Sequence, residues 1–322
     1  METTMSTRCS LVVNGKTVRC ATGDTPLETA LADGMIAATQ GVHGVTALGQ
    51  AALRRGRPRL RRSEAVKLPE IPERDGEGLA EVEPRAGKPA LAKRAGTLTE
   101  VTRLSPRLVQ AVVTLTKPLA VEPGHQVVLS PEGFAPLTLT PSLRVDGAAE
   151  LNELVFHLRC GQEGAEEGFA AALANGLALG HEVKAKGPVG RGQYRPGGGR
   201  LVLVASETGF AGIWAIARAA RYIEPAREIH LVVGARDPLD LYMRPALDWL
   251  KATGVSRITL VSERHRQRPP EVRPGPLTAH VPSLRTTDAV HVSGCAATVG
   301  AVEVLAAATG ARCYPIPLDP NA

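Results

Sequence analysis

The stretch Leu201–Arg221, LVLVASETGFAGIWAIARAAR, constrains the possible folds of this chain more than any other. It begins with an uninterrupted apolar run, 201–205, which is typical of a strand buried on both faces of a parallel sheet. The short turn Ser206–Gly209 follows, and apolar residues then recur at helical spacing. Strand, tight turn and helix form the unit in which α/β proteins bind phosphate, because the first helical turn offers free N–H groups. Since the same unit also occurs in α/β folds without a phosphate site, both interpretations stay open at this point.

The rest of the chain after residue 197 alternates apolar strand patterns with helical ones. We expect further strands at 228–233, 257–261 and 289–292, and helices at about 239–253 and 296–309. This alternation predicts a doubly wound parallel sheet with right-handed connections.

The preceding hundred residues have a pattern of short strands separated by turn residues. We expect strands at 108–115, 127–129, 135–140, 153–158 and 182–186, with one helix at about 166–174. Such a series predicts a small antiparallel barrel or sandwich. Near the N-terminus, two short runs around Asn14-Gly15 predict a β-hairpin over 9–21. Residues 51–97 are dense in Arg, Pro, Glu and Gly and are expected to form an irregular connection.

Composition narrows the class of protein and its expected location. Of 322 residues 43% are hydrophobic, and the mean hydropathy is −0.03. No run approaches the ~18 apolar residues of a membrane helix, and the first residues lack the pattern of a signal peptide. The five cysteines are scattered, which suits a reducing compartment and gives no metal-ligand spacing. We therefore expect a cytoplasmic protein with no membrane segment and no metal site.

The net charge of +6 is unevenly distributed, because arginines are concentrated in the run RRGRPRLRR. The six arginines of this run are Arg54, Arg55, Arg57, Arg59, Arg61 and Arg62. Such a run is typical of a solvated linker, of a nucleic-acid contact or of a contact with an acidic protein face. Because the run has no interleaved aromatic residues, we expect no nucleic-acid partner.

Four short glycine-containing segments follow one another along these two regions. Pro123-Gly124 precedes a barrel strand, Gly187-Pro188 follows another, Thr208-Gly209 lies in the first α/β turn, and Gly234–Asp237 follows the next α/β strand. In this order the chain resembles the ferredoxin–NAD(P) reductase superfamily, and within it the three-domain reductase components of oxygenases of the phenol hydroxylase and methane monooxygenase reductase type. The resemblance implies α/β plus β architecture: a degenerate [2Fe–2S] ferredoxin-like (β-grasp) module at 1–75, a linker at 76–97, a flavin-type antiparallel β-barrel at 98–196 and a nicotinamide-nucleotide-type α/β domain at 197–322.

The first motif that the resemblance implies, the cluster loop, has lost its ligands. Plant-type ferredoxins hold a [2Fe–2S] cluster with cysteines spaced C-x4-C-x2-C and a distant fourth. The positions that should be thiolates are Ala38, His43 and Thr46, and no cysteine lies between Cys20 and Cys160. Because alanine and threonine supply no thiolate, we expect no [2Fe–2S] cluster.

The second motif is the flavin strand. The family's Arg-x-Tyr-Ser pattern, in which arginine pairs with the flavin phosphate and tyrosine packs on the isoalloxazine, corresponds to Ala135, Leu137 and Thr138 here. Loss of the arginine removes one of the stronger polar contacts available to a phosphate. The next flavin element, a glycine-rich turn that opens a helix, reads Gly164–Gly168 and contains two glutamates, which favours an acid-capped helix over a phosphate site.

The third and fourth motifs belong to the nicotinamide nucleotide. The family's Gly-Gly-Thr-Gly turn reads Ser206–Gly209, and Glu207 brings a negative charge where a pyrophosphate should approach. Thr208 and Gly209 are retained, and so is Arg236 at the nucleotide's ribose end, so residual cofactor contacts are expected at these residues and at Thr138. The Cys-Gly-Pro turn beside the nicotinamide becomes Ser293-Gly294-Cys295, in which Cys295 is expected to be a buried structural thiol.

Four altered motifs on a preserved pattern lead to one main interpretation and two alternatives. The main one is a cofactor-free pseudo-reductase that acts by protein–protein contact, as a regulatory or assembly factor for an oxygenase or other metalloenzyme, with the six arginines at 54–62 touching an acidic partner. The first alternative is an active FAD-dependent NAD(P)H oxidoreductase that uses non-standard cofactor contacts. The second is a small-molecule sensor that uses the cleft between barrel and α/β domain.

Overall fold

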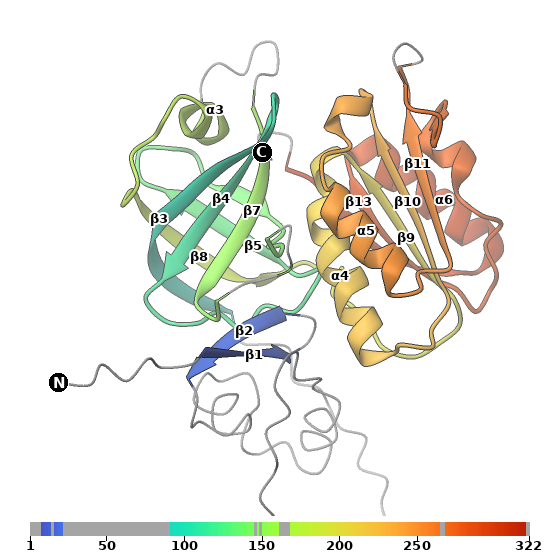
Figure 1. Ribbon diagram of the computed structural model, residues 1–322, viewed down its shortest axis with the longest axis horizontal. Coiled ribbons are helices and arrows are strands. Elements are labelled where there is room, and N and C mark those ends of the chain that lie inside the picture. The colour runs from blue at the N-terminus through green and yellow to red at the C-terminus, as the bar shows by residue number, and fades with distance from the viewer. Residues whose placement is uncertain are drawn as a thin grey trace, which may run out of the picture.

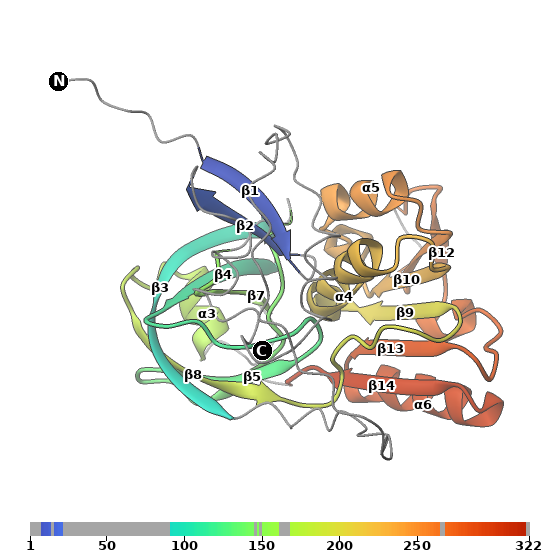
Figure 2. The same ribbon diagram turned by 90° about the horizontal axis from the view of Figure 1, so that it is seen from below.

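The computed structural model describes residues 8–13, 16–21, 91–144, 147, 150–160, 168–264 and 268–319. Strands β1 (Arg8–Val13) and β2 (Lys16–Ala21) pair antiparallel, which confirms the predicted hairpin, and both views place it beside the barrel (Figures 1 and 2). The former cluster positions Ala38, His43 and Thr46 lie outside the described residues, as does the arginine run at 54–62.

An antiparallel sheet forms the first large layer and curls into a half-barrel (Figure 1). Its order is β6-β5-β8-β3-β4-β7. The strands are β3 (Ala92–Ser105), β4 (Leu108–Leu115), β5 (Gln126–Pro131), β6 (Leu137–Leu139), β7 (Glu153–Arg159) and β8 (Glu182–Val189). All five strands predicted here are confirmed within a few residues. The sheet also includes β3, which begins inside the segment 76–97 that we expected to be a linker.

The barrel core is closed at one end by the short helix α3 (Phe169–Ala174). The helix was predicted from about residue 166, and it begins after Gly168, whose φ of 129° is a conformation that favours glycine. Phe169 and Leu173 pack into the barrel with Phe156 and Leu158 of β7. The two glutamates of the expected acid-capped turn, at 166 and 167, lie outside the described residues.

The second layer is a parallel sheet in the order β12-β11-β10-β9-β13-β14, as Figure 2 shows for most of its strands. Its strands are β9 (Leu201–Ser206), β10 (Ile229–Ala235), β11 (Arg257–Ser262), β12 (Val272–Pro274), β13 (Ala289–Gly294) and β14 (Arg312–Pro317). Strand β9 is buried at every residue and pairs with β10 and β13, as its continuous apolar run predicts.

The two edge strands, β12 and β14, were not predicted. Both contain proline: Pro274 ends β12, while Pro315 and Pro317 lie in β14. Proline has no N–H to donate to the hydrogen-bond ladder, so in a sequence it indicates that a segment is not a strand. An edge strand tolerates proline because one of its sides pairs with no neighbour.

Helices cover both faces of this sheet, which confirms the doubly wound architecture. Helices α4 (Phe210–Ile223) and α5 (Arg244–Ala252) belong to one core, and α6 (Ala296–Thr309) packs on the other face. The helix expected at about 239–253 is divided: a 3-10 turn, η2 (Pro238–Asp240), precedes α5, which starts with Pro245 in its first turn.

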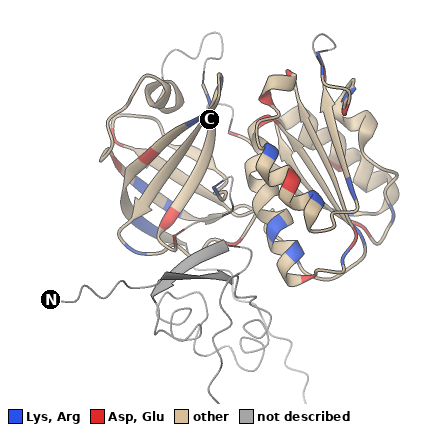
Figure 3. Cartoon of the chain, in the orientation of Figure 1, with Lys and Arg blue, Asp and Glu red and all other residues tan. Residues whose placement is uncertain are grey.

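Arg218 stabilises the contact between the first two of these helices. It lies 4.6 Å from the ring centroid of Trp249, and Trp214 beside it is fully buried. Basic residues occur along both helices, as the blue segments of Figure 3 show: Arg218, Arg221, Arg244 and Lys251. Within the described ranges, no helix combines the length and the apolar character needed to cross a bilayer.

Candidate functional site

A narrow cavity of about 20 Å³ lies where the barrel meets the carboxyl ends of the parallel strands. The barrel contributes Thr138, Thr140 and His157 to its walls, and the α/β domain contributes Thr208 and Ser293. The remaining lining residues include Leu139, Phe156, Ala211, Gly212, Leu318 and Asp319. The carboxyl ends of parallel strands are where open α/β sheets bind their ligands, so the cavity is the candidate site.

Three polar side chains around this cavity each have one buried atom that lacks a hydrogen-bond partner: Oγ1 of Thr140, Nε2 of His157 and Oγ of Ser293. The other ring nitrogen of His157 lies 2.9 Å from the hydroxyl of Tyr242. Burial lowers the pKa of His157 to about 3, so the ring is neutral at physiological pH. Unsatisfied buried polar atoms cost free energy, and gathered on one cavity they are typical of a site shaped for a polar ligand.

The first α/β turn is the 3-10 segment η1 (Glu207–Gly209). Glu207 has a φ of 54°, the only described non-glycine residue with positive φ. Its Oε1 accepts a hydrogen bond of 2.7 Å from the backbone N–H of Arg236, and its Oε2 lies 2.9 Å from a guanidinium nitrogen of Arg159 in the barrel. Gly209 lies so close to β13 that a Cβ would stand 2.4 Å from the Ser293 carbonyl oxygen.

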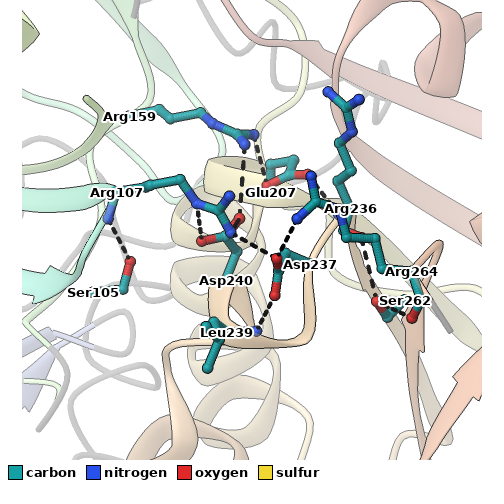
Figure 4. A network of polar contacts seen from close by, with 10 residues as sticks. All are labelled: Ser105, Arg107, Arg159, Glu207, Arg236, Asp237, Leu239, Asp240, Ser262 and Arg264. Carbon is teal, nitrogen blue, oxygen red and sulfur yellow. Dashed lines mark hydrogen bonds and ion pairs between the residues drawn. The ribbon is translucent and has the colours of Figure 1, made fainter. Parts of the chain in front are cut away.

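Figure 4 shows that two barrel arginines point toward carboxylates of the α/β domain. Arg107 lies 2.9 Å from Asp240 and 3.3 Å from Asp237, which Arg264 also contacts at 2.9 Å. The Asp240 side chain is 1% exposed. The backbone N–H of Leu239 holds the pKa of Asp237 below its usual value, and Arg107 adds to this effect. These pairs and the Arg159–Glu207 pair join the two domains directly beside the cavity.

Of the three predicted flavin-strand residues, only Thr138 lies at the cavity. Thr138 lines the cavity, and its backbone N–H donates to the Asp319 carboxylate at 2.8 Å. Leu137 is buried in the barrel core, and Ala135 is exposed before β6. Arg236 is exposed at the end of β10, beside Glu207.

On the nicotinamide side, Thr208 and Ser293 come together on the cavity, with Gly209 against β13. Cys295 corrects one expectation: it is exposed at the N-cap of α6, with its Sγ 3.3 Å from Thr298 Oγ1, and is not a buried thiol. The thiol follows the buried end of β13, where the chain leaves the sheet and reaches solvent.

Sequence reasoning missed four residues of the site: His157, Arg159, Asp240 and Asp319. His157 and Asp319 line the cavity, while Arg159 and Asp240 belong to the ion pairs between the barrel and the α/β domain. No motif of the sequence assigns any of the four to the site. Alternation along β7 is the one available signal, since it predicts which of its residues face inward.

No protein-family model matches the sequence. A curated relative, the reductase subunit of an aromatic O-demethylase from Amycolatopsis sp., is 34% identical over 151 residues, which are 45% of this chain and 44% of the relative. The match thus spans less than half of that relative's length.

Two solved structures have a similar fold. The Amycolatopsis cytochrome P450 reductase GcoB superimposes with a TM-score of 0.62 at 25% identity, over 73% of this chain and 72% of that one. The flavohem-like FAD/NAD binding domain of nitric oxide dioxygenase from Vibrio cholerae gives 0.59 at 16% identity, over 70% and 99% of the two chains.

These comparisons correct the main interpretation of the sequence. We expected a cofactor-free pseudo-reductase, yet the similar proteins of 25% identity or more are named as reductases. The expectation was wrong because it weighed the residues that the motifs have lost, while Thr138, Thr208 and Ser293 of the same motifs still line one cavity together with Thr140 and His157. The antiparallel half-barrel and parallel sheet of this chain form the ferredoxin reductase-like fold of oxygenase reductases.

Proposed function

We propose that this chain is the reductase component of an oxygenase or cytochrome P450 system, and that it passes electrons from NAD(P)H through FAD to a protein partner. The observation that carries the proposal is the set of unpartnered polar atoms on Thr140, His157 and Ser293 around one interdomain cavity. The reductase names of two relatives add support.

The donor set of the cavity suits the polar edge of a flavin ring and the carboxamide of a nicotinamide. Thr138 and Thr140 would hold the flavin from the barrel side, and His157 would contact it from β7. Thr208 and Ser293 would receive the nicotinamide from the α/β side. When bound, FAD accepts a hydride as an electron pair and releases single electrons. The residues that line the cavity would orient the two rings.

Two parts of the family's cofactor set do not fit these residues. The flavin strand has Ala135 where a phosphate-binding arginine is expected, so flavin affinity rests on the ring end of the cofactor. The cysteines of a plant-type [2Fe–2S] cluster are missing between Cys20 and Cys160, and we derive no electron-transfer step through a cluster.

The C-terminal segment lines the cavity and must move for a flavin to enter. A cavity of about 20 Å³ has room for roughly one water molecule. Leu318 and Asp319 form one wall, and Gln126 holds the segment from the barrel through a 2.9 Å hydrogen bond to the Pro317 carbonyl. Loading with FAD therefore requires this segment to leave Thr138.

The test is reconstitution of the full chain with FAD, followed by anaerobic addition of NADH or NADPH. We expect retained flavin absorbance that bleaches with one of the two nucleotides, and transfer of electrons to an artificial acceptor. Thr140→Val and Ser293→Ala should each weaken flavin retention or reduction. The control Thr102→Val, an exposed threonine of β3, should change neither. Absence of flavin retention by the wild type would overturn the proposal.

The partner is proposed to be an oxygenase or P450 component that meets the chain partly through the arginine run at 54–62. Contacts of this kind depend on complementary charge and weaken as salt rises. Reversal of the run to glutamate should slow reduction of the physiological partner while leaving reduction of an artificial acceptor intact. Equal rates with the partner would remove the run from the contact surface.

A further inference from the structure

Glu207 stands where a nucleotide's pyrophosphate is expected under the function proposed above, and it is already engaged as an anion. Its carboxylate accepts from the Arg236 N–H at 2.7 Å and pairs with Arg159 at 2.9 Å. A free backbone N–H and a guanidinium are the groups that bind phosphate at such turns. The protein thus satisfies its own phosphate-binding groups with a side-chain carboxylate.

The backbone of the turn and the burial of the ion pair both support this position of the Glu207 carboxylate. Glu207 adopts a left-handed φ of 54°, which costs a non-glycine residue free energy and persists where the surroundings compensate for it. Its side chain is 20% exposed and that of Arg159 19%, so the pair is shielded from much of the solvent's screening. Ser206, just before the turn, is buried and its Oγ lacks a partner, which marks the same place as a polar site.

Arg159 belongs to the barrel and Glu207 to the α/β domain, so the pair also links the domains. Asp240 lies 3.7 Å from a second guanidinium nitrogen of Arg159 and remains as a neighbour if Glu207 leaves. Release of Glu207 would therefore leave Arg159 in place, held by Asp240, with one nitrogen directed at the turn. A phosphate that enters the turn would find this guanidinium and the Arg236 N–H together.

We infer that Glu207 is an internal competitor for the nucleotide phosphates, and that NAD(P)H binding exchanges the Glu207 carboxylate for a phosphate on Arg159 and the Arg236 N–H. This inference rests on the proposed function and adds its regulation: the side chain at position 207 sets how tightly the nucleotide binds, and Arg159 is a nucleotide ligand contributed by the barrel. The exchange moves no electrons and breaks no covalent bond.

The experiment is calorimetric titration of the full-length chain with NAD⁺ and NADP⁺, using Glu207→Gln and Glu207→Gly. Glutamine keeps the size of the side chain without its charge, and glycine also accepts the positive φ. Both variants should bind the preferred nucleotide on the order of tenfold more tightly, because a like charge beside the phosphate is gone. The matched control is Glu271→Gln, an exposed carboxylate of the same domain that pairs with Arg244, and it should bind as the wild type does.

A double variant separates the two roles of Arg159. If Arg159 binds the phosphate, Glu207→Gln combined with Arg159→Gln should lose the gain in affinity of the single variant. Retention of the full gain would remove Arg159 as a ligand, and wild-type affinity in both Glu207 variants would overturn the inference while leaving the proposed function intact. Tighter binding to Glu207→Gln, combined with no bleaching of bound flavin when NADH or NADPH is added in a separate anaerobic experiment, would support the inference and overturn the proposed function. Absence of nucleotide binding in every variant would overturn both.

Discussion

The Nδ1 atom of His157 lies 2.9 Å from the hydroxyl of Tyr242, and this contact joins strand β7 of the barrel to the loop that precedes α5. The two rings meet edge to face with centroids 5.5 Å apart. Both side chains are shielded from solvent, and burial raises the pKa of Tyr242 as it lowers that of His157. The contact thus holds the neutral imidazole of His157 against Tyr242 of the α/β domain, in the wall of the cavity.

Stability should fall with acidity because His157 is buried in its neutral form. Its pKa is about 3 in the folded chain, against about 6.5 unfolded, so between these values only the unfolded chain takes up the proton. The free energy of unfolding should thus decrease by about 1.4 kcal/mol per pH unit for this group as pH drops below about 6.5. His291, whose pKa burial lowers to about 4, contributes in the same direction.

Urea unfolding between about pH 7 and about pH 5 measures this slope. His157→Gln should reduce this slope by the contribution of one histidine, which is at most about 1.4 kcal/mol per pH unit. Tyr242→Phe is the control, since it removes the hydroxyl but no group that titrates in this range, and it should keep the slope. An unchanged slope in His157→Gln would mean that the imidazole is protonated in the folded chain.

Arg107→Met should destabilise the protein through Asp240. The Asp240 carboxylate is nearly inaccessible, and Arg107 is its neighbour at 2.9 Å, with Arg159 farther off at 3.7 Å. Loss of the near cation from a buried pair should cost about 2 kcal/mol in the free energy of unfolding. Arg244→Met breaks an exposed pair with Glu271 and should cost less than about 0.5 kcal/mol. Equal losses in the two variants, measured by urea unfolding, would contradict this difference.

Gly209→Ala should disturb the turn η1 between β9 and α4. The added Cβ would stand 2.4 Å from the Ser293 carbonyl oxygen, and because that atom is backbone, η1 and β13 must separate. We expect a loss of about 2 kcal/mol in stability together with weaker nucleotide binding. Gly300→Ala, in α6, meets no atom within 4 Å and should stabilise the helix by about 0.5–1 kcal/mol. Thermal unfolding of both variants compares their stabilities directly. An unchanged stability of Gly209→Ala would show that the turn can move enough to accommodate the added Cβ.

Asp319→Ala should strengthen flavin binding. The Asp319 carboxylate accepts the Thr138 N–H at 2.8 Å. Under the proposed function a flavin would have to displace this carboxylate. Loss of one such hydrogen bond, worth about 1 kcal/mol, should lower the dissociation constant for FAD about fivefold in a fluorescence titration. Asp248→Ala, on the exposed side of α5, is the matched control and should leave FAD binding unchanged. Weaker flavin binding in Asp319→Ala would instead make the carboxylate a flavin contact.

The sequence by itself determined the elements whose signals are local. The apolar run 201–205 became a fully buried strand, short alternating runs became the barrel strands, and the order of the two regions identified the reductase fold. Burial on both faces or on one face leaves a pattern in neighbouring residues, so these predictions needed no long-range information. The edge strands β12 and β14 were not predicted, because they contain proline, which in a sequence indicates that a segment is not a strand.

Only the tertiary structure decided what the altered motifs mean. In the sequence, Glu207 is a charge that repels phosphate, while in the fold it is bound by Arg159 from β7 and by the Arg236 N–H from the end of β10. Thr138 and Asp319 likewise meet only because the C-terminal segment returns to the barrel. Residues so far apart along the chain leave no spacing to detect, since their contact depends on how two independently formed layers pack.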